Sequence, residues 1–191
     1  MENHGYELTL KFDLGENSLY DLGYLSIDIY HLIVFSELLE RRDSEGIDMV
    51  YNSSRVKSRF PLTREDNVLK NFRNKAIIKS VRNGSIELTI AGLSLISSII
   101  VPFIIYKLQK RDLRSDQNYL FEVNANDRDL NHIIDSFRDG YYGRGPSSIN
   151  WLFDILSRNG YDISFGGTDQ FVIRKVLERY ENRIIKIVEK R

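Results

Sequence analysis

Residues 88–106 read LTIAGLSLISSIIVPFIIY and contain no charged side chain. This stretch ends a β-rich segment whose two halves are joined by the sequence RNGS at 82–85. An Asn-Gly pair supplies the positive φ angles that a type I′ turn requires, so the sequence predicts a hairpin over 76–90. Because the first residues of the apolar stretch then belong to a strand, we expect a long apolar helix over 91–111.

The apolar stretch must be covered by something, and its length alone does not decide by what. Nineteen residues are close to the roughly 20 that a helix needs to cross the ~30 Å hydrocarbon core of a bilayer. The strand residues shorten the helical part, and Pro102 removes one of its backbone hydrogen bonds. Ser94, Ser98 and Pro102 recur every fourth residue and predict a ridge of small side chains that another helix can approach. Lipid, a second copy and the protein's own core all remain open.

The N-terminal part of the chain combines one strand with one helix. Apolar and polar residues alternate over 6–14, which predicts a half-buried strand. Leucines and isoleucines at helical spacing then predict a helix over 18–42 that packs on the sheet. The polar segment 43–60 is interpreted as a connector with a short strand at 47–51 and a short helix after it.

Beyond residue 115 the composition predicts three amphipathic helices with short strands near 119–123 and 161–165. The expected fold class is therefore α+β, with a small antiparallel sheet, a long apolar helix and a mostly helical C-terminal part. The predicted organisation is an α+β domain at 1–90, the apolar helix at 91–114 and the C-terminal region at 115–191.

Composition excludes several kinds of chemistry. The chain has 27 basic and 27 acidic residues and no cysteine, so disulfides, thiolate nucleophiles and cysteine-bound zinc are ruled out. The N-terminus lacks a basic segment followed by an apolar run, which predicts that the protein is not secreted. We expect a cytoplasmic body that associates with the inner membrane if lipid covers the apolar helix. The basic block 55–82 is a candidate contact for acidic headgroups or nucleic-acid phosphates.

Few residues suggest catalysis or ligand binding. His4, His31 and His132 lack partners at the spacing of metal ligands, so we expect no metal, no cofactor and no enzyme. The loop 140–146 is the best binding candidate, because Tyr141 and Tyr142 offer stacking faces and Arg144 could hold a phosphate. An ordinary glycine turn with two packed tyrosines explains the same residues.

The first half of the chain resembles a family of uncharacterised bacterial proteins. The resemblance rests on the strand, the sequence LYDLG at 19–23, and the hairpin ending GSIEL at 84–88 before a long apolar helix. It implies an architecture and brings no established activity.

Two classes of function follow as expectations. The first is a non-enzymatic assembly or signalling protein, membrane-associated or self-associating through helix 91–106, with an accessory or effector role in bacterial defence. Its partners would be copies of itself or another protein. The alternative is a soluble ligand-, nucleotide- or nucleic-acid-binding module that uses the basic block and the loop 140–146.

Overall fold

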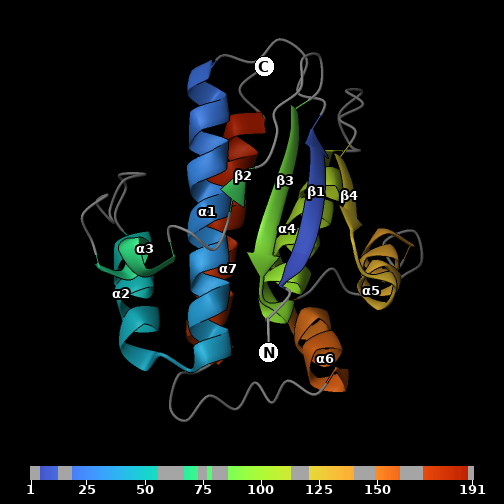
Figure 1. Cartoon of the computed structure of the whole chain (residues 1–191). Coiled ribbons are helices and arrows are strands. Elements are labelled where there is room, and N and C mark those ends of the chain that lie inside the picture. Colours follow the sequence, from blue (N-terminus) through green and yellow to red (C-terminus); the bar gives the residue numbers. More distant parts are fainter. Residues whose placement is uncertain are drawn as a thin grey trace.

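The chain folds into a mixed α+β structure that is mostly helical (Figure 1). The computed structural model describes residues 5–12, 19–55, 67–72, 77–78, 86–112, 121–139, 149–159 and 170–188. The elements within these residues are β1 (Tyr6–Phe12), α1 (Leu19–Arg41), α2 (Ser44–Ser54), α3 (Asn67–Phe72), β2 (Ile77–Ile78), β3 (Ile86–Leu93), α4 (Leu95–Asp112), β4 (Phe121–Ala125), α5 (Arg128–Asp139), α6 (Ile149–Arg158) and α7 (Gln170–Val188).

The sheet is antiparallel throughout, in the order β2-β3-β1-β4. Leu10 of β1 lies opposite Leu88 of β3 and Val123 of β4, and all three side chains are buried. On the other face, Lys11 pairs with Glu122 across the strands at 3.2 Å. The expected strand and the antiparallel pairing of the hairpin are confirmed, and their remaining residues, 13–14, 76 and 79–85, lie outside the described residues.

Helix α4 begins at Leu95 and its last six residues, Lys107 to Asp112, are mostly charged or polar, so the predicted start at residue 91 was wrong and an apolar helix as long as 91–111 is not confirmed. Ala91 to Leu93 still belong to β3, where Ala91 pairs with Ile77 and Leu93 pairs with Tyr6. Gly92 adopts a φ of 76°, and its backbone passes so close to Gly5 that a Cβ on Gly5 would lie 2.6 Å from it. The two glycines approach each other beside the register shift between Tyr6 and Leu8 of β1. Strand β3 ends one residue after Gly92, at Leu93.

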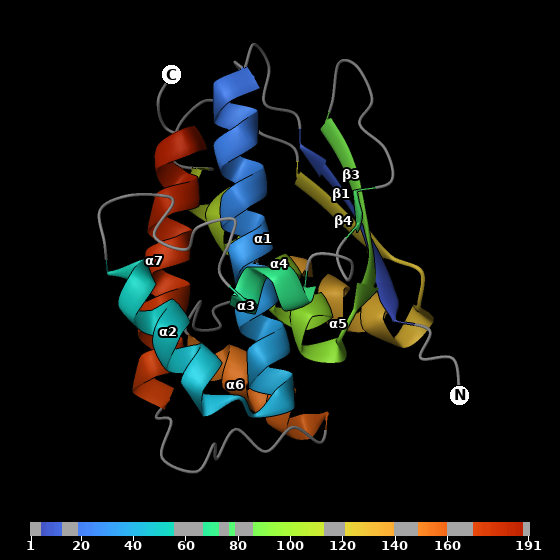
Figure 2. The same cartoon turned by 60° about the vertical axis from the view of Figure 1, so that its left-hand side comes forward.

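Helix α4 lies in the middle of the protein. It contacts β1 and β4 of the sheet and the helices α1, α5, α6 and α7, and α1 and α4 lie on the same side of the sheet (Figure 2). Each described side chain from Ile96 to Tyr106 is buried. One hydrophobic core thus continues across the predicted domain limits at 90 and 114. No helix among the described residues is long and apolar enough to cross a membrane.

The partly buried N-terminus of α4 receives two of its hydrogen-bond acceptors from α1. The Glu37 carboxylate, 3% exposed, accepts hydrogen bonds from the Ser94 amide at 2.7 Å and the Ser97 hydroxyl at 3.0 Å. The Glu40 carboxylate accepts one from the Ile96 amide at 3.2 Å. These amides have no partner within the helix, and carboxylates also complement the positive end of its dipole. The contact therefore fixes where α4 starts against α1.

The segment 47–51, predicted as a short strand, is part of α2. Helix α1 ends at Arg41. The next residue, Arg42, has a φ of 55°, and the Asp43 amide donates to the Leu38 carbonyl at 3.0 Å. Asp43 then caps α2 by accepting from the Gly46 amide at 2.9 Å. Ile47 and Val50 are both buried, which is the three-residue spacing of a helix. The strand prediction failed because neither the tight reversal nor the cap was recognised.

The C-terminal helices α5, α6 and α7 also pack against α4. Strand β4 lies two residues later than the predicted strand near 119–123, helix α5 follows it, and the predicted strand at 161–165 lies outside the described residues. Three aromatic rings connect α4, α5 and α6: Phe137 packs edge to face against Phe103 at 5.6 Å and against Trp151 at 5.3 Å. Helix α7 packs along α1 on the side away from the sheet.

The capping contact predicts an unequal effect of two glutamate substitutions. Glu37→Ala should lower the free energy of unfolding by about 1–3 kcal/mol, because the Ser94 amide and Ser97 hydroxyl lose their buried acceptor. Glu40→Ala is the matched control and should cost less, because Glu40 is exposed and water can replace it. Urea unfolding with an unchanged m-value measures both. Equal losses of unfolding free energy in the two variants would show that the Glu37 contact contributes no more stability than the exposed Glu40 contact.

Candidate functional site

The residues predicted for ligand binding are only partly within the described structure. Tyr141, Tyr142 and Arg144 lie outside the described residues. Of the basic residues in the block 55–82, the structure describes Arg55 and Lys70, and both are exposed. The role of the loop and of most of the basic block therefore stays a prediction.

Of the small-residue ridge Ser94, Ser98 and Pro102, the last two residues are buried and Ser94 is half-buried. The Ser98 hydroxyl, fully buried, donates to the Ser94 carbonyl four residues earlier at 2.8 Å. The Ser94 hydroxyl accepts from the Ser97 amide at 3.2 Å and so caps α4. Pro102 is buried as well. These three residues thus serve the start and the packing of α4 within the chain.

A cluster of buried polar side chains lies where α1 meets α7. Asp28 and His31 come from α1, and Tyr180 and Arg183 come from α7. An Asp28 carboxylate oxygen lies 4.0 Å from the Arg183 guanidinium, and the His31 and Tyr180 rings meet edge to face at 6.0 Å. Asp28, His31 and Tyr180 are at most 3% exposed. We name these four residues the α1–α7 polar cluster.

Burial dominates the electrostatics of this cluster. It lowers the pKa of His31 from 6.5 to about 4, and the nearby Arg183 charge acts in the same direction. Burial also raises the pKa of Tyr180 above its usual value of 10, against the opposing effect of Arg183. At neutral pH both rings are therefore uncharged.

Two arginines of α7 connect the cluster to the C-terminal end of α2. Arg183 donates to the Ser54 carbonyl at 3.1 Å. Arg179 donates to the Tyr51 carbonyl at 3.1 Å and to the Ser54 hydroxyl at 2.8 Å, and its guanidinium lies 4.7 Å from the centre of the Tyr51 ring. Cations at the C-terminal end of a helix complement its dipole and its unpaired carbonyls. These contacts hold α2 against α7.

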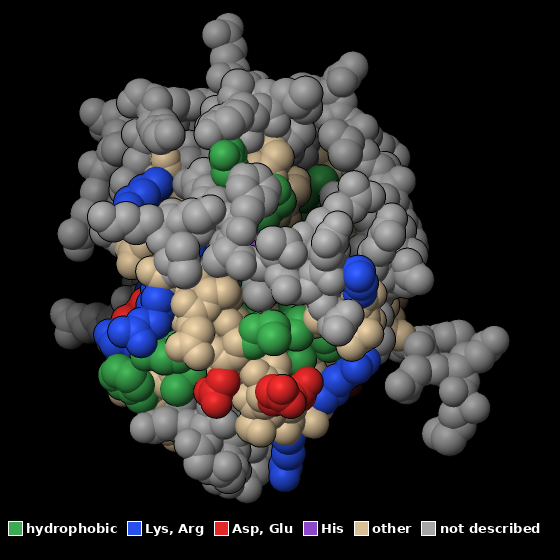
Figure 3. Space-filling view, turned by 90° about the vertical axis from the view of Figure 1, so that its left-hand side faces the viewer, with side chains coloured by type: hydrophobic (Ala, Val, Ile, Leu, Met, Phe, Trp, Pro, Cys, Tyr) green, Lys and Arg blue, Asp and Glu red, His purple; other side chains and the backbone are tan. Residues whose placement is uncertain are grey.

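The outer surface of α2 and α7 carries the largest exposed apolar side chains of the described residues. Met49 of α2 is 41% exposed and Phe171 of α7 is 51% exposed. Hydrophobic, acidic and basic side chains lie close together on this side of the molecule (Figure 3). We name the surface formed by these two residues, by Glu45 and Asp48 of α2 and by Arg55 directly after α2, the α2–α7 face.

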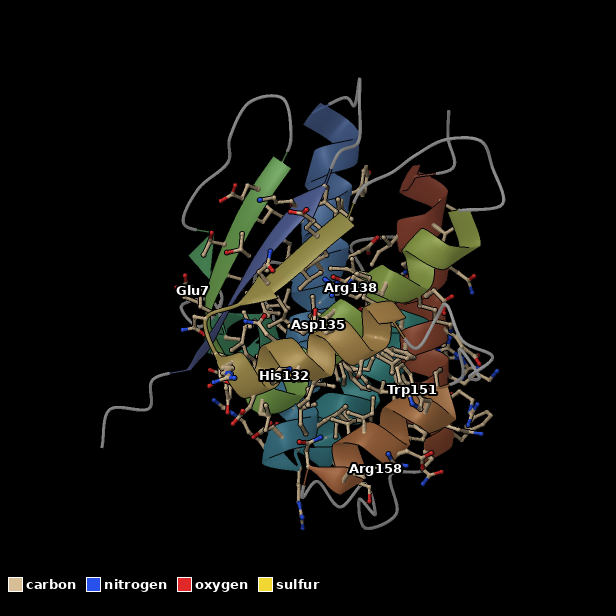
Figure 4. All side chains as sticks on the ribbon, turned by 90° about the vertical axis from the view of Figure 1, so that its right-hand side faces the viewer. Glu7, His132, Asp135, Arg138, Trp151 and Arg158 are labelled. Carbon is tan, nitrogen blue, oxygen red and sulfur yellow. The ribbon has the colours of Figure 1, made fainter. Side chains whose placement is uncertain are left out.

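The outer side of α5 is polar and does not form a metal site. His132, Asp135 and Arg138 lie along this helix, and Asp135 pairs with Arg138 at 2.9 Å (Figure 4). Asp127 caps the helix by accepting from the Leu130 amide at 2.8 Å. Within the described ranges, three or more histidine or acidic side chains nowhere come together as possible metal ligands.

Sequence reasoning missed the buried polar residues of α1. Asp28 lies between Ile27 and Ile29, and Glu37 lies just before Leu38 and Leu39. A charged residue inside such an apolar run is the one available signal, because charged side chains are seldom fully buried without a partner. The partners themselves come from α4 and α7, which are more than fifty residues away along the chain.

Comparison with known proteins adds no identity: no family model, no curated protein and no solved structure matches the chain.

The lowered pKa of His31 predicts acid destabilisation. Neutral His31 is favoured in the folded state, so the unfolded state binds the proton at higher pH. Stability should fall as the pH falls from 6.5 to about 4, by on the order of 3 kcal/mol at 1.36 kcal/mol per pKa unit. His31→Leu should remove this part of the pH dependence, measured by urea unfolding at several pH values. His132→Gln, exposed on α5, is the matched control, and an unchanged slope in His31→Leu would contradict the assignment.

Lys107 of α4 and Glu181 of α7 form a second buried polar contact, an ion pair. A separate prediction follows from it. Lys107→Met should lower stability by about 3 kcal/mol, because it leaves the nearly buried Glu181 carboxylate without its partner. The double variant Lys107→Met/Glu181→Met should recover most of that loss, since no buried charge remains. Thermal or urea unfolding of both variants measures the difference. Losses that simply add would show that the two side chains do not interact.

Proposed function

We propose that this chain is a non-enzymatic assembly protein that self-associates through the α2–α7 face. The observation that carries the proposal is the exposure of Met49 and Phe171 on two helices that contact each other. Most of the other large apolar side chains whose burial the structure describes are packed into or against one core. Aromatic side chains and methionine are enriched in protein–protein interfaces, where they supply apolar area that a partner can cover.

The proposal moves the contact away from the helix that the sequence suggested. The side chains of α4 from Ile96 to Tyr106 already pack within the chain's own core, so they offer no outer surface in this fold. The α2–α7 face offers both apolar side chains and charges of both signs, which is typical of the rim and centre of an interface. A role in bacterial signalling or defence stays a prediction that depends on such assembly.

The alternative function, a soluble ligand- or nucleic-acid-binding module, also stays a prediction. It depends mainly on the loop 140–146 and on a basic block of which the structure describes two basic residues, Arg55 and Lys70. Binding to nucleic acid would weaken steeply with added salt.

Sedimentation velocity of the full chain tests self-association. The mass should rise from 22.4 kDa toward twice that value as the protein concentration increases through the micromolar range. Met49→Ser combined with Phe171→Ser should raise the dissociation constant about fivefold or more, because two apolar contacts are lost. His132→Ser on α5 is the matched surface control. A mass of 22.4 kDa at every concentration would overturn the proposal.

A further inference from the structure

The exposed side of α2 carries an ordered row of polar side chains. Glu45, Asp48, Asn52 and Arg55 are all exposed, at spacings of three and four residues that place them on one side of the helix. Gly46, Ile47, Val50 and Ser54 are buried on the opposite side. Met49, one residue after Asp48, lies at the border of the exposed row.

The charges of this row are separated along the helix. Its first half is acidic, with Glu45 and Asp48, and Arg55, the residue directly after the helix, is basic and exposed, with its guanidinium 5.8 Å from the centre of the Tyr51 ring. Arg179 and Arg183 of α7 add positive charge at that same end, where they bind the last turn of α2. Asp48 and Arg55 are separated by about 10 Å along the helix axis at ~1.5 Å per residue, so they do not pair within one chain.

The helix dipole explains only part of this arrangement. Asp43 caps α2 and Glu45 lies in its first turn, where negative charge is favourable. Asp48 lies beyond the first turn, where that effect has largely gone. The helix dipole therefore does not explain the acidic side chain beside the exposed Met49.

We propose that a second copy of this chain docks its α2 antiparallel on this α2, about a two-fold axis that passes near Asn52. The inference rests on the proposed self-association and names its geometry. A two-fold contact is self-complementary, so Asp48 of each protomer faces Arg55 of its partner and the same pair forms twice. Met49 is then covered beside the axis. A parallel arrangement would instead place Asp48 near Asp48, and like charges in an interface disfavour it.

Charge reversal tests this geometry directly. Asp48→Lys alone should raise the dissociation constant of the dimer about tenfold or more, because two attractive pairs become repulsive. Arg55→Glu alone should do the same. An equimolar mixture of the two variants should form heterodimers about as tightly as the unchanged protein, since the two reversed charges then face each other and the remaining Asp48 faces the remaining Arg55. Native mass spectrometry separates these species, and Asp154→Lys on the exposed side of α6 is the control.

The possible results separate the two proposals. If the unchanged chain stays monomeric, the proposed self-association fails and this geometry fails with it. If the unchanged chain dimerises and both single variants dimerise equally well, self-association stands and the α2 contact is wrong. If both variants are monomeric and remain so in the mixture while folded by circular dichroism, the antiparallel pairing is wrong. Heterodimers in the mixture support the pairing.

Discussion

The start of α4 is the constraint on which the rest of the fold depends. The side chains of this helix are buried from Ile96 to Tyr106, and its first amides, which have no acceptor within the helix, lie in a partly buried position against α1. Glu37 of α1 provides that acceptor and is itself 3% exposed. A buried carboxylate is tolerated only where it receives several hydrogen bonds, and Ser94 and Ser97 donate them. The position of α1 therefore follows from the position of α4.

Polar contacts of the same kind determine how α7 lies against the two central helices. Lys107 of α4 pairs with Glu181, and Asp28 of α1 lies against Arg183. Apolar side chains alone would allow α1, α4 and α7 to slide past one another at little cost, because one aliphatic contact resembles the next. A buried charge separated from its partner is costly, and this gives the three helices one preferred register. Arg183 also reaches the last turn of α2, so the register extends to the surface.

Sequence reasoning succeeded where a local pattern carries the information. The alternation around Leu8 and Leu10, and the hairpin ending in β3, predict the sheet because strand periodicity is visible in short windows. It failed at the boundary between β3 and α4, since Leu93 is held in the strand by pairing with Tyr6, far away along the chain. Helix α2 was missed because a cap and a tight reversal outweigh its polar composition. The buried partners of Glu37 were equally invisible, because they depend on tertiary contacts.

The serines of α4 show why a small-residue ridge is ambiguous in a sequence. Serines at a spacing of four residues can form a ridge that lets a second helix approach. The same serines at the same spacing can also form hydrogen bonds within the first turn of their own helix. In this fold Ser94 and Ser98 form their hydrogen bonds within α4 and against α1. Helix α2 departs from the expected pattern in another way: the apolar side chain of Met49 is exposed although the helix has a buried side. Departures of this kind from consistent patterning are expected at functional surfaces, which is why α2 rather than α4 is the better place to look for a partner.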